Sequence, residues 1–286
     1  MVRPRGAPAN PRAQKGTPMD SLSPLLLQLT RDVGGPWQVG ALLAVGVVYG
    51  VINTLSGGGS VLSLPALLFL GLPPHVANGT NRVVGVTQTL SALLAFWRGG
   101  ALKGERVWGW FALAAAGGAL GAYASLRVPA AALAALMQLC LSAIALGTLL
   151  TPPRLLRGAP PPPRGLLARA LGAVVVVLYG GFLQAGVGLL IVYYLRFTWG
   201  YDLVRATALK TLLAAGLMLP SLVTFAVYAE IRWGVGLTLA LGGAVGAQLG
   251  VRVSLSPRGA QVIRVALPVT ALLMVGALAW RAARGG

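Results

Sequence analysis

The chain has 286 residues, of which 56% are hydrophobic and 10% are charged, with a mean hydropathy of +0.78. Soluble domains average about 45–50% apolar and about 25% charged residues, so this composition is that of an integral membrane protein. The apolar runs are too long and too continuous for the alternating strands of an outer-membrane barrel, so we expect helices. The formal charge of +18 does not indicate nucleic-acid binding, because the arginines lie at the ends of apolar runs rather than in a stripe interleaved with aromatic residues.

The N-terminal stretch differs from the rest of the chain. Residues 1–35 are rich in Pro, Arg, Gly and Ala and show no periodic apolar pattern, so we expect a disordered cytoplasmic tail. Met19 begins a more ordinary leader sequence, which leaves open that the residues before it stem from an upstream start codon. The single cysteine, Cys140, lies in an apolar run and cannot form an internal disulfide or a metal cluster on its own.

From Trp37 onward the chain predicts eight membrane-spanning units, since a spanning helix needs about 20 apolar residues. The predicted units are 37–70, 76–97, 107–126, 130–150, 166–195, 203–228, 233–253 and 260–280. Four consecutive prolines forbid a helix in the stretch 151–165, which we interpret as a semi-rigid cytoplasmic linker. The predicted organisation is a tail (1–35), a first repeat (36–150), the linker (151–165), a second repeat (166–281) and a short C-terminal tail (282–286).

The two halves resemble each other in sequence. At a constant offset of 125, Ala114–Val128 aligns with Leu239–Val253, and the matches include three glycines in each copy. The matched pairs are Gly117/Gly242, Gly118/Gly243 and Gly121/Gly246. Duplicated membrane proteins are most often transporters with their site at the repeat interface. Four helices per repeat is an even number, so we predict parallel repeats, with the long first helix of each repeat broken.

Basic residues predict an orientation for this eight-span arrangement. With the N-terminus inside, fifteen of the 23 Lys and Arg residues fall on the inner side and six on the outer side, while Arg82 and Lys210 lie within spans. By the positive-inside rule, both termini are predicted to be cytoplasmic, in a bacterial inner membrane.

A polar, glycine-dense patch interrupts the first apolar unit, at Asn53–Ser60. Non-helical backbone at bilayer depth is tolerated only where it is buried in protein or lines a watery cavity. If Ser56–Ser60 ends one half-helix and starts another, the free N–H groups and the positive dipole end of the second half would attract an oxyanion. The three glycines would then allow close backbone approach. The alternative interpretation is a glycine-rich packing notch.

Two cations, Arg82 and Lys210, lie about one turn into predicted spans, and at an offset of 129 Lys210 matches Asn81. A cation inside a span costs roughly 2.5–3.5 kcal/mol on insertion scales and normally faces a partner, a cavity or the interface. None of the five acidic residues lies within a confidently predicted span, so an anion from solution is a natural partner. The alternative is that both side chains extend to the lipid headgroups.

Three further titratable residues, His75, Asp202 and Glu230, are candidates for coupling transport to protons, although each is predicted in a loop or at a span end, where solvated side chains are usual. No Ser/His/Asp order, HExxH pattern, intramembrane aspartate pair or nucleotide signature occurs in the sequence. We therefore expect no enzyme activity, no cofactor and no metal site. The sequence neither establishes nor excludes ion coupling or a homo-oligomer.

One run of motifs in the first half resembles a known family. Gly57-Gly58-Gly59-Ser60 is followed by Pro65-Ala66-Leu67, by Gly71 and by Ala77-Asn78-Gly79-Thr80-Asn81. These elements, over roughly residues 37–280, are similar to the sulfite exporter TauE/SafE family of bacterial anion transporters. The second copy departs from the pattern. Residues 184–190 lack the triple glycine, and residues 205–210 do not reproduce the run of small polar residues found at 77–81 in the first copy. The resemblance implies transport of sulfite, thiosulfate, sulfonates or related small anions without ATP.

Together these observations predict an all-α polytopic secondary transporter that moves a small, sulfur-containing oxyanion across a lipid bilayer. The glycine patch would cradle the anion, the two cations would supply positive potential, and nearby amides and hydroxyls would add hydrogen bonds. The candidate substrate-binding residues are Asn53, Ser56, Gly57, Gly58, Gly59, Ser60, Asn78, Thr80, Asn81, Arg82, Gln184 and Lys210. Two other classes stay open: a membrane scaffold or assembly protein whose small-residue faces bind partner helices, and a carrier of another small metabolite or a cation.

Overall fold

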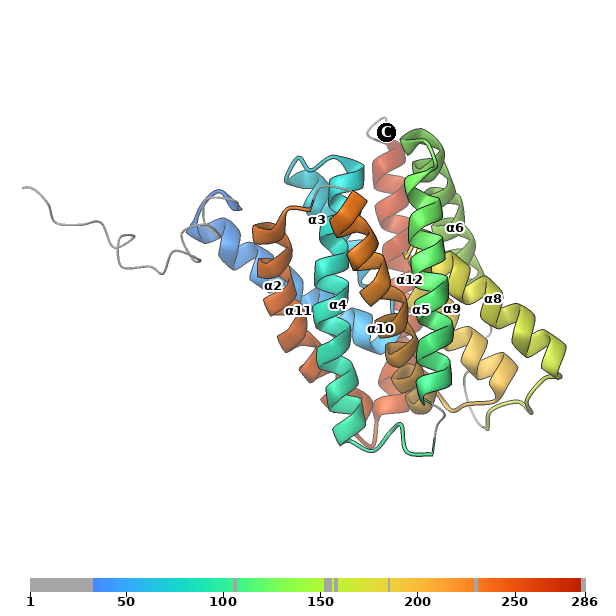
Figure 1. Cartoon of the computed structure of the whole chain (residues 1–286). Coiled ribbons are helices and arrows are strands. Elements are labelled where there is room, and N and C mark those ends of the chain that lie inside the picture. Colours follow the sequence, from blue (N-terminus) through green and yellow to red (C-terminus); the bar gives the residue numbers. More distant parts are fainter. Residues whose placement is uncertain are drawn as a thin grey trace, which may run out of the picture.

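The computed structural model of the chain describes residues 33–104, 107–151, 156, 159–184, 186–228 and 231–283. Within these ranges every regular element is a helix, which confirms the predicted all-α class (Figure 1). The helices are α2 (Pro36–Ser56), α3 (Ser60–Phe69), α4 (Pro74–Arg98), α5 (Val107–Leu126), α6 (Ala130–Leu150), α8 (Leu166–Phe182), α9 (Val187–Tyr194), the π-helical turn η1 (Leu195–Trp199), α10 (Leu203–Tyr228), α11 (Trp233–Ser254) and α12 (Gly259–Ala283). By length and composition, α2, most of α5, α10 and α11 could each cross a membrane, and shorter apolar helices accompany them. Most of the predicted N-terminal tail lies outside the described residues.

α4 and α10 occupy corresponding places in the two halves of the sequence, yet they run in opposite directions. The loop after α4 meets the start of α10, where the Arg205 guanidinium donates to the Lys103 carbonyl at 3.0 Å. α11 runs in the same direction as α4, since the Arg232 N–H at its start donates to the Thr80 hydroxyl near the start of α4, at 3.1 Å. We call the end of the bundle at which α4 begins the upper end and the opposite end the lower end, as in Figure 1.

α2 and α3 form a hairpin that enters the bundle from the upper end and returns to it. Val33, just before α2, lies in the same apolar cluster as Leu72, just before α4. The last turn of α2 is level with the middle of α4, because the Asn53 amide donates to Gln88 at 2.7 Å. After a short break, α3 leads back to the start of α4 at the upper end (Figure 1).

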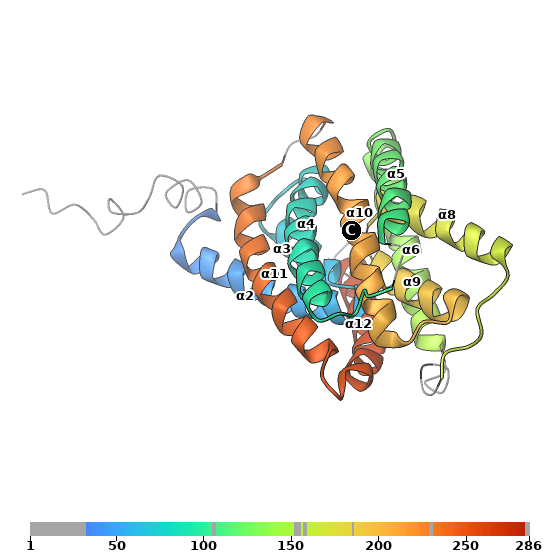
Figure 2. The same ribbon diagram turned by 60° about the horizontal axis from the view of Figure 1, so that its bottom comes forward.

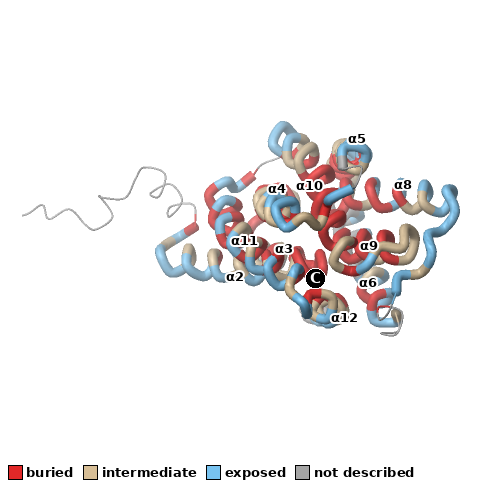
Figure 3. The backbone as a smooth tube through the Cα atoms, turned by 90° about the horizontal axis from the view of Figure 1, so that it is seen from below, coloured by how far each residue is buried: buried red, intermediate tan, exposed pale blue. Residues whose placement is uncertain are grey.

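α8, α9 and η1 form a second hairpin, which enters from the lower end. The Arg164 N–H before α8 donates to the Thr198 carbonyl in η1 at 3.0 Å, and the Tyr194 hydroxyl donates to the Arg169 carbonyl at 2.7 Å. The start of α8 therefore lies beside the end of η1, and the chain continues into α10 at the lower end. α2 and α8 lie on opposite flanks of the bundle (Figure 2). In the view from below they extend sideways, whereas most other helices are seen nearly end-on (Figure 3).

This course of the chain corrects two predictions. Each long broken unit was expected to cross the bundle, giving eight spans, but each turns back at its break and leaves from the side on which it entered. Among the described helices, those that run from end to end are α4, α5, α6, α10, α11 and α12 (Figure 1). Three is an odd number, so equivalent helices of the two halves point in opposite directions, and the predicted parallel arrangement is wrong.

The repeated glycines explain how the halves are joined. On α11, an added Cβ at Gly242 or Gly246 would overlap backbone of α2, and on α5 an added Cβ at Gly121 would lie 2.5 Å from the Phe182 nitrogen of α8. Each glycine copy therefore lets the broken helix of the other half approach at backbone distance, which is the use that small residues have in membrane helices. The two halves are interleaved rather than set side by side as separate lobes.

Candidate functional site

The tips of the two hairpins meet in the interior of the bundle. An added Cβ at Gly57, in the break between α2 and α3, would overlap the backbone of Gly188 in the first turn of α9, and the reverse also holds. Both glycines are buried. The polar patch that the sequence marked as a break therefore lies against the second break, away from the bundle surface.

The glycines of the first tip serve the turn and its packing. Gly57 adopts the left-handed conformation with φ of 81° and ends α2, where its N–H donates to the Asn53 carbonyl at 2.8 Å. An added Cβ at Gly58 would overlap the Thr270 side chain of α12, and one at Gly59 would lie 2.5 Å from the Asn53 Cβ. The packing-notch interpretation thus describes these three glycines well, because each has a close neighbour.

Lys210 reaches this tip from α10. Its ammonium group donates to the carbonyls of Asn53 and Thr54, at 2.7 and 2.6 Å, and its side chain is 3% exposed. The last carbonyls of a helix lack intrahelical partners and carry the negative end of its dipole, so a cation stabilises them. Lys210 therefore does not extend to the lipid headgroups, and the helix end supplies its partners.

Arg82 occupies the corresponding position at the second tip, from α4. One terminal nitrogen donates to the carbonyl of Gly181, in the last turn of α8, at 3.3 Å, and the guanidinium lies 5.1 Å from the centroid of the Phe225 ring. The side chain is 0% exposed, so Arg82 does not reach the headgroups either. Its Nε and its second terminal nitrogen have no hydrogen-bond partner among the described residues.

Gln184 follows α8 at the second break and adopts φ of 57°, the only positive value at a described residue other than glycine. Such a conformation costs roughly 1–2 kcal/mol for an L-residue and often marks a functional site. Its amide nitrogen lies 3.5 Å from the Met218 sulfur, a weak acceptor, and its carbonyl oxygen is buried without a partner among the described residues. The amide also packs on Gly85, one turn beyond Arg82 on the same face of α4.

A side-chain network supports the first tip. The Asn53 amide donates to Gln88, whose own amide donates to the Thr54 hydroxyl at 2.9 Å, and the Gly59 N–H donates to the Asn53 carbonyl oxygen at 3.2 Å. The hydroxyls of Ser56 and Thr270 form a hydrogen bond of 2.7 Å. These contacts satisfy most polar groups of the tip and hold it to α4 and α12.

The other predicted residues lie around the two tips or farther up α4. Ser60 starts α3, Asn81 accepts a 2.6 Å hydrogen bond from the Ser63 hydroxyl, and Thr80 accepts from the backbone at the start of α11. Asn78 is buried in the second turn of α4, toward the upper end. The fold thus brings Asn53, Ser56, Lys210 and the glycines together, sets Arg82 and Gln184 at the facing tip, and places Asn78 and Thr80 nearer the upper end.

Sequence reasoning missed several residues of this region: Gln88, Met218, Phe225 and Thr270. Only Gln88 gave a usable signal, since a glutamine in an apolar membrane helix needs hydrogen-bond partners. Met218, Phe225 and Thr270 are ordinary residues of apolar helices. Their role follows from the helix packing alone.

The candidate proton carriers lie away from the tips or outside the described residues. Asp202 accepts hydrogen bonds from the N–H groups of Val204 and Arg205, both at 3.0 Å, and so caps the start of α10. His75 is half-buried in the first turn of α4, and Glu230 lies outside the described residues. No group of three or more potential metal ligands occurs in the described part of the chain.

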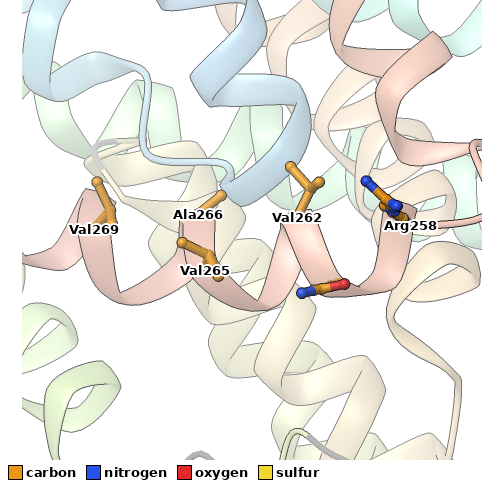
Figure 4. Close-up of a pocket in the computed structure, with 6 residues that line it drawn as sticks. Arg258, Val262, Val265, Ala266 and Val269 are labelled. Carbon is orange, nitrogen blue, oxygen red and sulfur yellow. The ribbon is translucent and has the colours of Figure 1, made fainter.

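A groove of about 640 Å³ lies along α12, and the residues that line it belong to this helix rather than to either tip. Arg258 and Gln261 line its lower part, and Val262, Val265 and Val269 continue it along the helix (Figure 4). Its apolar lining is on the outer side of α12, where Val265 and Val269 are exposed. The groove is therefore not the site that the two tips form.

The family comparison agrees with the resemblance seen in the motifs. A family model described as Sulfite exporter TauE/SafE matches residues 42–278, from within α2 to within α12, and so includes both hairpin tips. The chain belongs to the TauE/SafE family.

Related proteins are named as membrane transporters. A probable membrane transporter protein of Haemophilus influenzae is 28% identical over 239 residues, covering 84% of this chain and 93% of the relative. The probable membrane transporter protein ORF9 of a Sinorhizobium species is 29% identical, covering 82% and 89%. The probable membrane transporter protein YfcA of Escherichia coli K12 is 28% identical, covering 84% and 88%. The chain is thus a membrane transporter of the TauE/SafE family. The alternative of a membrane scaffold does not explain why its relatives are named as transporters.

Proposed function

We propose that this TauE/SafE transporter moves a small sulfur-containing oxyanion, such as sulfite, thiosulfate or an organosulfonate, and binds it at the second tip. The observation that carries the proposal is the burial of the Arg82 guanidinium with few hydrogen-bond partners among the described residues. A fully buried guanidinium with two nitrogens that lack partners among the described residues is costly unless a ligand completes it, and charge-assisted hydrogen bonds to an oxyanion suit that geometry.

The surroundings of Arg82 support an anion over a neutral or cationic solute. Among the described residues the acidic one is Asp202, which lies exposed at the lower end and caps α10. α9 begins next to the second break without a side-chain cap, so its positive dipole end is directed into the interior. The Gln184 amide packs on Gly85, one turn beyond Arg82 on α4. Its oxygen has no hydrogen-bond partner among the described residues, so it suits a ligand that also carries an O–H or N–H group.

The remaining predicted residues act on the tips in this proposal. Lys210 and the network of Asn53 and Ser56 hold the first tip, and the glycine contacts let both tips meet. The chain then consists of two inverted repeats, each with one hairpin and three crossing helices. Transport requires the hairpin tips to move relative to these crossing helices. Inverted repeats with broken helices at the midplane are a recurring design of secondary transporters.

The corrected topology also changes the proposed orientation. Of the basic side chains that the structure describes other than Arg82 and Lys210, nine lie at the lower end: Arg98, Lys103, Arg164, Arg169, Arg196, Arg205, Arg252, Arg258 and Arg264. Arg127 and Arg232 lie at the upper end. By the positive-inside rule, we therefore propose that the lower end faces the cytoplasm of a plasma-membrane protein and that Val33 and Ala283 lie on the outer side. This reverses the predicted cytoplasmic termini, which had assumed eight crossings.

The test of function is uptake of labelled oxyanions into proteoliposomes at two pH values. We expect uptake of sulfite or a related sulfur oxyanion, competition by unlabelled substrate, and a rise in KM of roughly ten- to hundredfold for Arg82→Gln, the loss expected for a charge-assisted hydrogen bond. Transport of neutral solutes without competition by any oxyanion would contradict the proposal.

A further inference from the structure

The end of α2 presents backbone carbonyls in the interior of the bundle. The Asn53 and Thr54 carbonyls belong to the last turn of α2, where carbonyls run out of donors within the helix. The Asn53 carbonyl accepts from the N–H of Gly57, which ends the helix. Water could satisfy such groups at a surface, but this end is buried, because Thr54 is 1% exposed. A helix end in this situation needs a fixed donor.

Lys210 meets this need. Two of its three N–H groups donate to the two carbonyls at 2.6 and 2.7 Å, distances typical of charge-assisted hydrogen bonds. The ammonium charge thereby faces the negative end of the α2 dipole. Because the contact crosses from α10 to α2, it also ties the second half of the sequence to the hairpin of the first half.

We propose that Lys210 is a positioning residue that locks the α2–α3 tip, and that it is not a ligand of the transported anion. The inference rests on the proposed function for its account of transport, but its structural part stands alone. An anion bound to Lys210 could use only the third N–H group without displacing a carbonyl, and it would lie beside carbonyl oxygens that repel it. Arg82 differs, since its open nitrogens need no such exchange.

The tip is expected to loosen, not unfold, when Lys210 is removed. The links from Asn53 and Thr54 to Gln88, and from Ser56 to Thr270, do not involve Lys210 and remain in place. Loss of the ammonium leaves the buried Thr54 carbonyl unsatisfied and the Asn53 carbonyl with the Gly57 N–H alone, which favours conformations in which water reaches the tip. Exposure of the tip is therefore the direct readout of the role of Lys210.

The experiment measures thiol accessibility in membranes. In a Cys140→Ala background, a cysteine replaces Ser60, which starts α3 and is 7% exposed, and its rate of reaction with methyl methanethiosulfonate is followed. We expect at least about tenfold faster labelling with Lys210→Met, an intermediate rate with Lys210→Gln, and near-parental protection with Lys210→Arg, which keeps the charge and two donors. Lys103→Met, which removes an exposed cation from the loop after α4, is the matched control and should leave the rate unchanged.

Two outcomes would overturn the inference. One is parental labelling in both Lys210→Met and Lys210→Gln. The other is a rise in KM for sulfite with Lys210→Gln as large as that with Arg82→Gln, since the positioning role predicts a lower maximal rate with KM within about twofold. If the parent transports no oxyanion, the proposed function fails, while the labelling rates still decide the role of Lys210. If Lys210→Met does not insert, Lys210→Gln and Lys210→Arg give the same comparison.

Discussion

The two hairpin tips are built on the same plan but differ in how completely their polar groups are satisfied. At the α2–α3 tip, Lys210 makes two short hydrogen bonds to the helix end, and Asn53 is tied to Gln88. At the α8–α9 tip, Arg82 makes one hydrogen bond of 3.3 Å, and Gln184 has the Met218 sulfur as its hydrogen-bond partner. At the first tip, the hydroxyl of Tyr49, whose ring packs on Gly59, is buried without a partner among the described residues, whereas the second tip has three such atoms on Arg82 and Gln184.

This difference distinguishes a cation that holds a hairpin tip in place from a cation that can bind a ligand. In each half, a cation on the helix after the hairpin faces the broken helix of the other half, so the same plan could serve two purposes. Where two of the three N–H groups of the cation are held by carbonyls, as in Lys210, it stabilises the fold. Where it retains free N–H groups, as Arg82 does, it can take a ligand. The departure of the second copy from the family's glycine motif falls at the second tip.

The contact shared by both tips gives the largest expected effect. Gly57→Ala places a Cβ on the Gly188 backbone and in a left-handed conformation, so we expect a loss of about 2–5 kcal/mol of stability and a low yield of folded protein. Thermal unfolding in detergent measures it. Gly40→Ala is the matched control, because nothing lies within 4 Å of an added Cβ there. Equal stability of the two variants would refute the close meeting of the tips.

Removing the network of the first tip should have a smaller effect. Gln88→Leu leaves the Asn53 amide and the Thr54 hydroxyl without their side-chain partner, at a cost of about 1–3 kcal/mol. We expect a lower melting temperature with KM for the anion nearly unchanged, because the network belongs to the first tip. The exposed Gln261→Leu on α12 should change neither quantity. A KM effect without a stability effect would instead place Gln88 in the binding site.

The smallest effect is expected outside both tips. Asp202→Ala removes the cap of α10 and should cost about 0.5–2 kcal/mol. The KM and the pH dependence of transport should stay as in the parent, since Asp202 lies at the lower end. Asp202→Asn keeps the cap but cannot titrate. A pH profile altered by both Asp202→Ala and Asp202→Asn would therefore assign a proton-carrying role to this residue and weaken the division between tip and periphery.

Much of the fold was predictable from the sequence. Hydropathy gave helix ranges close to those observed, and the glycine patch marked the first break correctly, because a broken helix in apolar surroundings must be buried in protein. The burial of Arg82 and Lys210 was one of two alternatives that the sequence left open. The repeated glycines of α5 and α11 were visible, although their contact with the broken helices was not.

The rest depended on packing that leaves no local signal. α2 is long and apolar enough to span a membrane, so nothing in its composition shows that it lies obliquely and stops level with the middle of α4. Because α2 stops there and the chain turns back, three end-to-end helices follow in the first half. The two repeats are therefore antiparallel and not parallel as predicted. The partners of Lys210 are backbone carbonyls, which any residue carries, and Gln184 gained its importance only from its conformation.

The most direct test of the account is the dissociation constant of purified protein for sulfite, compared between Arg82→Gln and Lys210→Gln. The account predicts binding at least about tenfold weaker for Arg82→Gln and within about twofold of the parent for Lys210→Gln. Parental affinity in Arg82→Gln, or the larger loss in Lys210→Gln, would contradict it.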